Sequence, residues 1–165
     1  MIEKGFPSVE WDKMWEATAE TLYMTGMSVV AIFIFGILLG LVLFLTSKGN
    51  LWENKLVYTI IGAYVNIFRS IPFIILIVLL IPFTTFIMNT MIGEKAALPA
   101  LIIGTAPFYA RMVEIALREI DKGVIEAAKA MGAKTSTIIW KVLLPESLPA
   151  IISGITVTTI ALVGY

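Results

Sequence analysis

The sequence predicts an all-α fold, a bundle of several helices that cross a membrane. Of the 165 residues, 59% are hydrophobic and only 15% are charged, and the mean hydropathy is +0.94. Soluble domains are about 45–50% apolar, with about a quarter of their residues charged. The bilayer is therefore the expected solvent, and the long uncharged runs of the chain are the expected membrane spans.

The composition also excludes several kinds of chemistry. The chain contains neither Cys nor His, so disulfides, zinc clusters and catalysis by these side chains are excluded. The formal net charge is zero, which gives no reason to expect a nucleic-acid partner. We expect no cofactor and no metal.

Four uncharged runs define the expected organisation of a single domain over 1–165. About 20 helical residues cross a hydrocarbon core of about 30 Å. The third run reaches this length only if Arg111 turns its charged end toward the headgroups. The expected spans are 21–47, 70–93, 96–115 and 147–165, with an external tail at 1–20 and a loop at 116–146.

The second span has a special entry and a special shape. Residues 56–68 are also uncharged, but joined to the run after Arg69 they would exceed one span. We therefore expect 56–68 to lie at the membrane interface, with the crossing beginning near Ser70. Pro72 and Pro82 are expected to bend this span, because proline interrupts helical hydrogen bonding.

The basic residues of the short loops predict the orientation of the chain. Six of them lie between the third and fourth spans, whereas the segment between the second and third spans has Lys95 alone. Lys and Arg are enriched on the cytoplasmic side. The N-terminus is therefore expected outside and the 116–146 loop in the cytoplasm. The six are Arg111, Arg118, Lys122, Lys129, Lys134 and Lys141.

Small and charged residues inside the spans leave alternatives open. Gly36 and Gly40 are spaced for close helix contact, either within the chain or along a dimer seam. Arg69 either turns toward the headgroups or, with Ser70 and Pro72, lines the cytoplasmic mouth of a pathway. Otherwise we expect no ionisable residue in the middle of a span, which argues against an ion-coupled carrier. If the protein moves a solute, its energy should come from another subunit.

The 116–146 loop predicts two short helices. Asp121 is the expected N-cap of the first and Gly132 its C-terminal stop. Thr135 or Ser136 is the expected cap of the second, which Pro145 should end. The first helix either lies on the lipid surface or docks on a protein partner. Its small apolar face favours the partner; this face comprises Val124, Ala127, Ala128 and Met131.

The loop carries a spaced motif that resembles the coupling-loop signature of bacterial ABC importer permeases. The motif is Glu126-Ala127-Ala128, three residues, Gly132, nine residues, Val142, one residue, Leu144-Pro145. The family more often has Ile at the position of Val142. Two further stretches, VNIFRSIPFIILIVLLIPF (65–83) and GTAPFYARMVEIALREI (104–120), are similar to the methionine-import permeases. The resemblance covers nearly the whole chain.

The resemblance implies a type I importer permease that works in the bacterial plasma membrane as a homodimer. Two copies of a cytoplasmic ATPase would bind its coupling loops, and an external binding protein would deliver D- or L-methionine. The implied ATPase-coupling residues are Glu126, Ala127, Ala128, Met131, Gly132, Val142, Leu144 and Pro145. The subunit itself would not be an enzyme, and its sequence has no Gly-x-x-x-x-Gly-Lys-Ser/Thr phosphate loop.

The sequence leaves alternatives open for the extent of the chain, its cargo and its role. Family members continue beyond the residue matching Tyr165 into a fifth span. The sequence is therefore expected to be a fragment or a truncated, transport-inactive subunit. Another small solute could be the cargo, or the chain could be a membrane scaffold. The carboxylates of Glu114, Glu119 and Asp121 are interpreted as solvated cytoplasmic charge rather than as an enzyme site.

Overall fold

The fold is built from helices, and the described residues contain no strand. The computed structural model describes residues 10–90 and 93–164, so the expectations for the tail at 1–9, for 91–92 and for Tyr165 lie outside the described residues. The elements are α1 (Trp11–Thr46), α2 (Lys55–Ser70), α3 (Phe73–Met88), α4 (Glu94–Arg118), α5 (Lys122–Ala130), α6 (Thr135–Ile138), a π-helix η1 (Ile139–Leu143) and α7 (Leu144–Val163).

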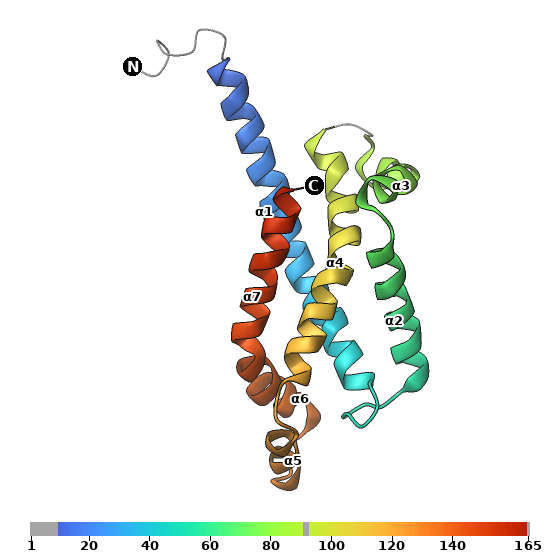
Figure 1. Cartoon of the computed structure of the whole chain (residues 1–165), viewed down its shortest axis with the longest axis vertical. Coiled ribbons are helices and arrows are strands. Elements are labelled where there is room, and N and C mark those ends of the chain that lie inside the picture. Colours follow the sequence, from blue (N-terminus) through green and yellow to red (C-terminus); the bar gives the residue numbers. More distant parts are fainter. Residues whose placement is uncertain (1–9, 91–92, 165) are drawn as a thin grey trace.

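Helix α4 is the centre of the bundle. It packs against α1, α7, α3 and α2, whereas α5 and α6 extend from one end of the bundle (Figure 1). Three described helical segments are long and apolar enough to cross a membrane: α1, α4 and the run from Thr135 to Val163. The bent pair α2–α3 adds a fourth candidate. The expected fold class, a polytopic all-α bundle, is confirmed.

Glycines let α1 and α7 approach α4 closely around Tyr109. A Cβ atom added to Gly36 would lie 2.3 Å from Tyr109 Cδ1, and one added to Gly40 would lie 2.7 Å from the carbonyl oxygen of Ala110. A Cβ atom added to Gly154 of α7 would lie 3.4 Å from Tyr109 Cε2, and the Tyr109 hydroxyl donates to the carbonyl of Ile151 at 3.2 Å. Of the two interpretations of the glycine pair, packing within the chain is therefore the one observed.

This contact gives a matched pair of predictions about stability. We expect Gly40→Ala to destabilise the solubilised protein by about 2 kcal/mol, because the new methyl group meets backbone of α4 and overpacks the interface. Gly26→Ala on the same helix should be neutral, since nothing lies within 4 Å of its added Cβ. Denaturant titration in detergent measures both changes. Equal stability of the two variants would contradict close packing of α1 on α4.

The segment around Pro72 differs from the expected arrangement. Helix α2 runs lengthwise along the bundle (Figure 1), and α3, which also packs on α4, makes a bend of 114° with α2. The sequence suggested an interfacial helix at 56–68 followed by a crossing bent at Pro72 and Pro82. The bend occurs where Pro72 forms the N-cap of α3, as expected for a proline, whereas Pro82 lies within α3. Hydropathy could not predict whether α2 or α3 runs lengthwise along the bundle, because both helices are largely apolar.

The other helices follow the expected spans with shifted ends. Helix α1 ends at Thr46, close to the expected 47, and it begins at Trp11, so residues 11–20 of the expected external tail are helical. Helix α4 includes the whole of the expected 96–115. Helix α7 begins at Leu144, three residues before the expected start at Ser147.

Pro145 does not end the second loop helix, contrary to expectation. Helix α6, the π-helix and α7 follow one another without a break, and Pro145 occupies the first turn of α7. A proline ring clashes with the carbonyl four residues earlier in an α-helix. The π-helix relieves this conflict, since the amide of Leu144 bonds the carbonyl of Ile139, five residues back. The expected cap was also wrong: Lys134 is the N-cap of α6, and no side chain caps it.

Candidate functional site: a projecting coupling element and a buried ionic cluster

Helix α5 is bounded by two strong local signals, both expected from the sequence. The Asp121 carboxylate accepts the amide of Gly123 at 2.7 Å and so caps the N-terminus. Gly132 has φ +77°, a left-handed conformation that glycine adopts without strain. The amides of Gly132 and Ala133 donate to the carbonyls of Lys129 and Ala128, which completes a Schellman C-cap. Both ends of α5 are thus determined by residues close to them in the sequence.

The motif residues of α5 divide between two faces. Ala128 and Ile125 are buried and belong to the hydrophobic core of the chain. Val124 and Ala127 are exposed, and Met131 is 82% exposed. The expectation that Ala128 shares the outward face is therefore wrong, because the bundle takes Ile125 and Ala128 for its own packing. The face left for a partner is formed by Val124, Ala127 and Met131.

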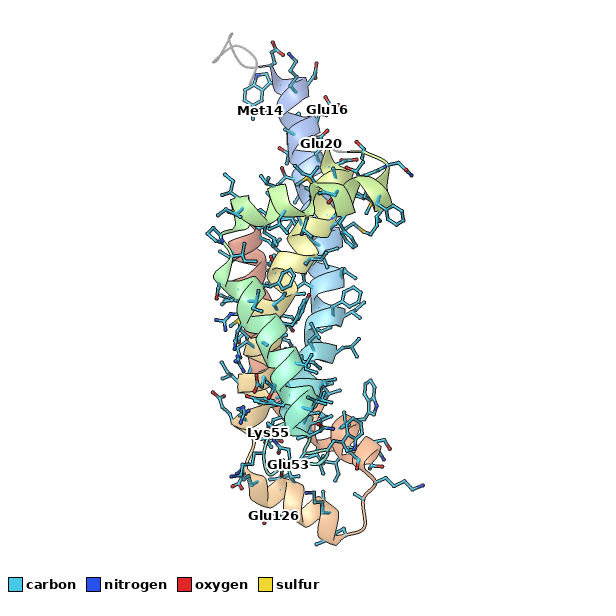
Figure 2. All side chains as sticks on the ribbon, turned by 90° about the vertical axis from the view of Figure 1, so that its right-hand side faces the viewer. Met14, Glu16, Glu20, Glu53, Lys55 and Glu126 are labelled. Carbon is cyan, nitrogen blue, oxygen red and sulfur yellow. The ribbon has the colours of Figure 1, made fainter. Side chains whose placement is uncertain are left out.

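Glu126 lies exposed beside the connection between α1 and α2. It lines a small depression with Gly49, Asn50 and Leu51 of that connection, together with Lys122 and Lys129 of its own helix. No ion pair to its carboxylate is found among the described residues. The carboxylate is therefore available for a partner outside the chain, and it projects from the same end of the molecule as Lys55 (Figure 2).

The rest of the motif joins this element to the bundle. Val142 and Leu144 are half-buried and pack against the core. Pro145 is exposed and lines an apolar groove between α1 and α7. These residues therefore connect α5 to the long helix α7.

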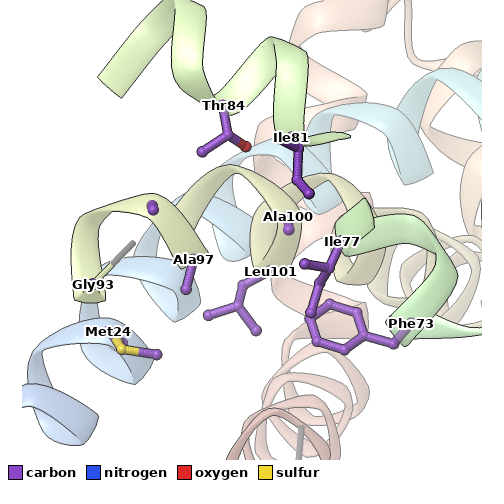
Figure 3. A pocket seen from close by; sticks show the side chains of 10 residues that line it. Met24, Phe73, Ile77, Ile81, Thr84, Gly93, Ala97, Ala100 and Leu101 are labelled. Atoms are coloured by element: carbon purple, nitrogen blue, oxygen red, sulfur yellow. The ribbon is translucent and has the colours of Figure 1, made fainter. Parts of the chain in front are cut away.

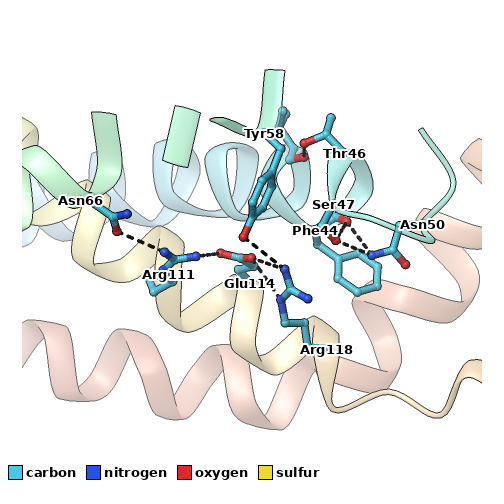
Figure 4. A network of polar contacts seen from close by, with 10 residues as sticks. Phe44, Thr46, Ser47, Asn50, Tyr58, Asn66, Arg111, Glu114 and Arg118 are labelled. Carbon is cyan, nitrogen blue, oxygen red and sulfur yellow. Dashed lines mark hydrogen bonds and ion pairs between the residues drawn. The ribbon is translucent and has the colours of Figure 1, made fainter. Parts of the chain in front are cut away.

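Glu114 is a functional candidate that the sequence interpretation missed. It was grouped with solvated charges, yet its side chain is only 1% exposed. Its carboxylate accepts from Arg111 at 2.5 Å and from Arg118 at 2.7 Å (Figure 4). Arg111 is therefore paired inside the protein rather than turned toward the headgroups. The i, i+3 and i, i+4 spacing to two arginines on one helix was the available signal.

The same cluster ties α4 to α2. Arg111 donates to the side-chain oxygen of Asn66 at 3.1 Å, and Arg118 reaches the hydroxyl of Tyr58 at 3.5 Å (Figure 4). Asn66 and Tyr58 are both α2 residues, 45 and 60 positions away in the sequence. The cluster lies in the last two turns of α4, close before α5 in the sequence, and it joins α4 to α2.

Arg69, Ser70 and Pro72 gather at the bend between α2 and α3, away from α5. Helix α2 begins at Lys55, at the end of the molecule that carries α5, and Arg69 is about 21 Å farther along this helix. These three residues therefore lie at the far end of α2 from α5, and their place at the cytoplasmic mouth of a pathway stays a prediction. The Ser70 hydroxyl bonds the carbonyl of Asn66, and the guanidinium carbon of Arg69 lies 5.8 Å from the centroid of the Phe108 ring.

A separate cavity lies between α1, α3 and α4. It has a volume of about 230 Å³ and is lined mainly by apolar side chains such as Met24, Ile81 and Leu101 (Figure 3). No Asp, Glu, Lys or Arg lines it. We assign no role to this cavity.

This fold and site define the class as a polytopic helical membrane protein with a short helix that projects from one end of the bundle. The family model of the binding-protein-dependent transport system inner membrane component matches residues 32–165. The chain therefore belongs to this family, and it is a multi-pass membrane protein.

The chain is similar to named relatives over nearly its whole length. It is 68% identical to the methionine import system permease protein MetP of Bacillus subtilis over 99% of this chain and 74% of MetP. It is 52% identical to the D-methionine transport system permease protein MetI of Escherichia coli strain K12, over 88% of this chain and 67% of that protein. The chain thus spans about three quarters of the length of MetP.

Solved structures agree with this assignment. A chain from inward-facing conformations of the MetNI methionine ABC transporter has a TM-score of 0.91 and 49% identity, covering 95% of this chain and 74% of that one. A chain from an amino acid ABC transporter crystallised with histidines has a TM-score of 0.67 at 20% identity, covering 95% of this chain and 73% of that one. The second likeness supports the fold alone.

Proposed function

We propose that this chain is the permease subunit of an ATP-driven importer and that its cargo is methionine, D- or L-, or a similar amino acid. The observation that carries the proposal is α5, a capped helix with an exposed apolar face and an unpaired exposed glutamate at one end of a membrane bundle. Short amphipathic helices of this kind dock in grooves of partner proteins. The names of the relatives support methionine as the cargo.

The proposed assembly contains two copies of this chain, two ATPase subunits and an external solute-binding protein. ATP hydrolysis belongs to the ATPase partner, so this subunit is not an enzyme. Closure of the ATPase pair would move the docked α5 helices and switch the permease between inward- and outward-facing states. The roles of Glu126, Ala127, Met131 and Gly132 in docking, and of Ala128, Val142, Leu144 and Pro145 in joining α5 to the bundle, belong to this proposal.

We also propose the orientation in the bacterial plasma membrane. Basic residues gather at the end of the molecule that carries α5, and they include Lys122, Lys129 and Lys134. Glu16 and Glu20 lie near the start of α1, at the opposite end of the molecule (Figure 2). By the positive-inside rule the α5 end faces the cytoplasm and the N-terminus faces outside. Helices α1, α4 and α7 would each cross once, with the bent pair α2–α3 as the remaining crossing.

Uptake into proteoliposomes tests the proposal. The permease, reconstituted with its ATPase and binding protein, is expected to accumulate labelled methionine only when ATP is supplied at the ATPase side. Excess unlabelled L- or D-methionine should compete, whereas an unrelated charged amino acid should not. Failure of both methionine enantiomers to compete would exclude methionine as the cargo, and uptake without ATP would contradict ATP-driven import.

A further inference from the structure

We propose that the cavity at the bend between α2 and α3 binds the cargo inside the permease, with Arg69 holding the carboxylate of the amino acid. This inference rests on the proposed function and adds a contact site for the transported molecule. The cavity has a volume of about 410 Å³, within the range of about 300–1,000 Å³ typical of small-molecule sites. The residues that form it come from both sides of the bend and from the middle of α4.

The first argument is the depth of the charge. Arg69 lies over the ring of Phe108, which is about 21 Å along α4 from Glu94 and about 15 Å from Arg118. The guanidinium is therefore beside the middle of a helix long enough to cross the membrane. Charged side chains at such depth are costly, and those that occur face a cavity or a charged partner and mark substrate pathways.

The second argument is the missing counter-charge. Arg111 and Arg118 share the carboxylate of Glu114, but no ion pair to Arg69 is found among the described residues. Arg69 is exposed and lines the cavity, and its guanidinium makes a cation–π contact with the face of the Phe108 ring. A guanidinium presents paired N–H donors that match a carboxylate in a bidentate arrangement. An amino-acid carboxylate would supply the charge that the protein does not.

The third argument is the rest of the lining. Phe68, Phe73, Leu76 and Phe108 surround Arg69 with apolar side chains, three of them aromatic. Thioether sulfur makes favourable contacts with aromatic rings, so the cavity suits an amino acid with a methionine-like side chain. Gly104 brings the walls together, since a Cβ added to it would lie 2.7 Å from Leu76 Cδ2.

Equilibrium binding of labelled L-methionine tests this site directly. The permease–ATPase complex is placed in phosphatidylcholine nanodiscs without the binding protein, so that only the membrane site is measured. We expect saturable binding by the wild type and a Kd about tenfold higher for Arg69→Gln, the effect of losing one charge-assisted interaction. Arg69→Lys should recover part of the affinity, and Lys55→Gln, at the other end of α2, should bind as the wild type does.

Methioninamide, which lacks the carboxylate, separates recognition of the charge from a general loss of structure. Arg69→Gln should leave the weak binding of methioninamide unchanged. Equal methionine affinity of wild type and Arg69→Gln, or no saturable binding by the wild type, would overturn the inference. Loss of the ATPase from the Arg69→Gln complex would also overturn it, because the residue would then be structural.

Two further outcomes distinguish the alternatives. A second set of nanodiscs mixes phosphatidylcholine and phosphatidylglycerol. If Arg69→Gln leaves methionine binding intact but abolishes a preference for phosphatidylglycerol in these, a lipid phosphate is the natural occupant and the inference fails. The proposed function is judged separately, by ATP-driven uptake in the wild type. Normal uptake by both wild type and Arg69→Gln would defeat only the assignment of this site.

Discussion

Glu126→Lys is expected to abolish co-purification of the ATPase with the permease. The carboxylate of Glu126 is exposed and makes no ion pair within the described chain, so its reversal should leave the fold of the bundle intact. In a docked complex the same change replaces an attractive charge by a repulsive one. Truncating one member of a buried interfacial pair costs about 2–5 kcal/mol, so a reversal should raise Kd by at least about 100-fold.

The control for this experiment is Glu146→Lys. Glu146 is also exposed, lies at the start of α7 and undergoes the same change in net charge. A tagged permease carrying Glu146→Lys should recover the ATPase at the wild-type level. Equal recovery with Glu126→Lys and Glu146→Lys would show that Glu126 takes no part in docking, whatever the fold of the loop.

Glu114→Ala is expected to have the largest effect on stability. The substitution leaves the guanidiniums of Arg111 and Arg118 without their shared carboxylate, and the Arg111 side chain is only 25% exposed. Removing one partner of a buried ionic cluster costs about 3–5 kcal/mol, because the remaining charge stays desolvated. It should also loosen α2, which the arginines hold through Asn66 and Tyr58.

Denaturant titration of the solubilised protein measures this effect against Glu119→Ala. Glu119 is exposed, and its removal should change the free energy of unfolding by less than about 0.5 kcal/mol. Similar values for the two alanine variants would show that the cluster around Glu114 does not stabilise the bundle.

Local signals predicted local structure well. The Asp121 cap and the Gly132 stop fixed α5 to within a residue, because each acts through bonds to its immediate neighbours. The end of α1 near Ser47 followed from the loss of hydropathy after the span. The motif from Glu126 to Pro145 identified the family, which the comparisons confirm.

Features that depend on distant residues were not predictable from the sequence in this way. The burial of Glu114 depends on α2 passing beside it, and Asn66 is 45 positions away. Helix α2 rather than α3 runs lengthwise along the bundle. This arrangement depends on the contacts that the two helices make with α4, not on their hydropathy. The continuity of the helix through Pro145 required a π-helix, and single-residue propensities favour a break at that position.

The proposed docking of the ATPase on α5 can be measured directly, because the sequence contains no cysteine. In Met131→Cys the only thiol of the chain lies on the outward face of α5, where the native side chain is 82% exposed. Trp15→Cys places a thiol near the start of α1, at the end of the molecule opposite α5, where the native side chain is 71% exposed.

The measurement is the rate of maleimide labelling of each thiol, with and without bound ATPase. Docking at α5 predicts that the ATPase slows the labelling of Met131→Cys at least about tenfold and leaves Trp15→Cys unchanged, because contact excludes reagent only where the partner sits. Equal labelling rates of Met131→Cys in the free permease and in the ATPase complex would contradict the proposed docking surface.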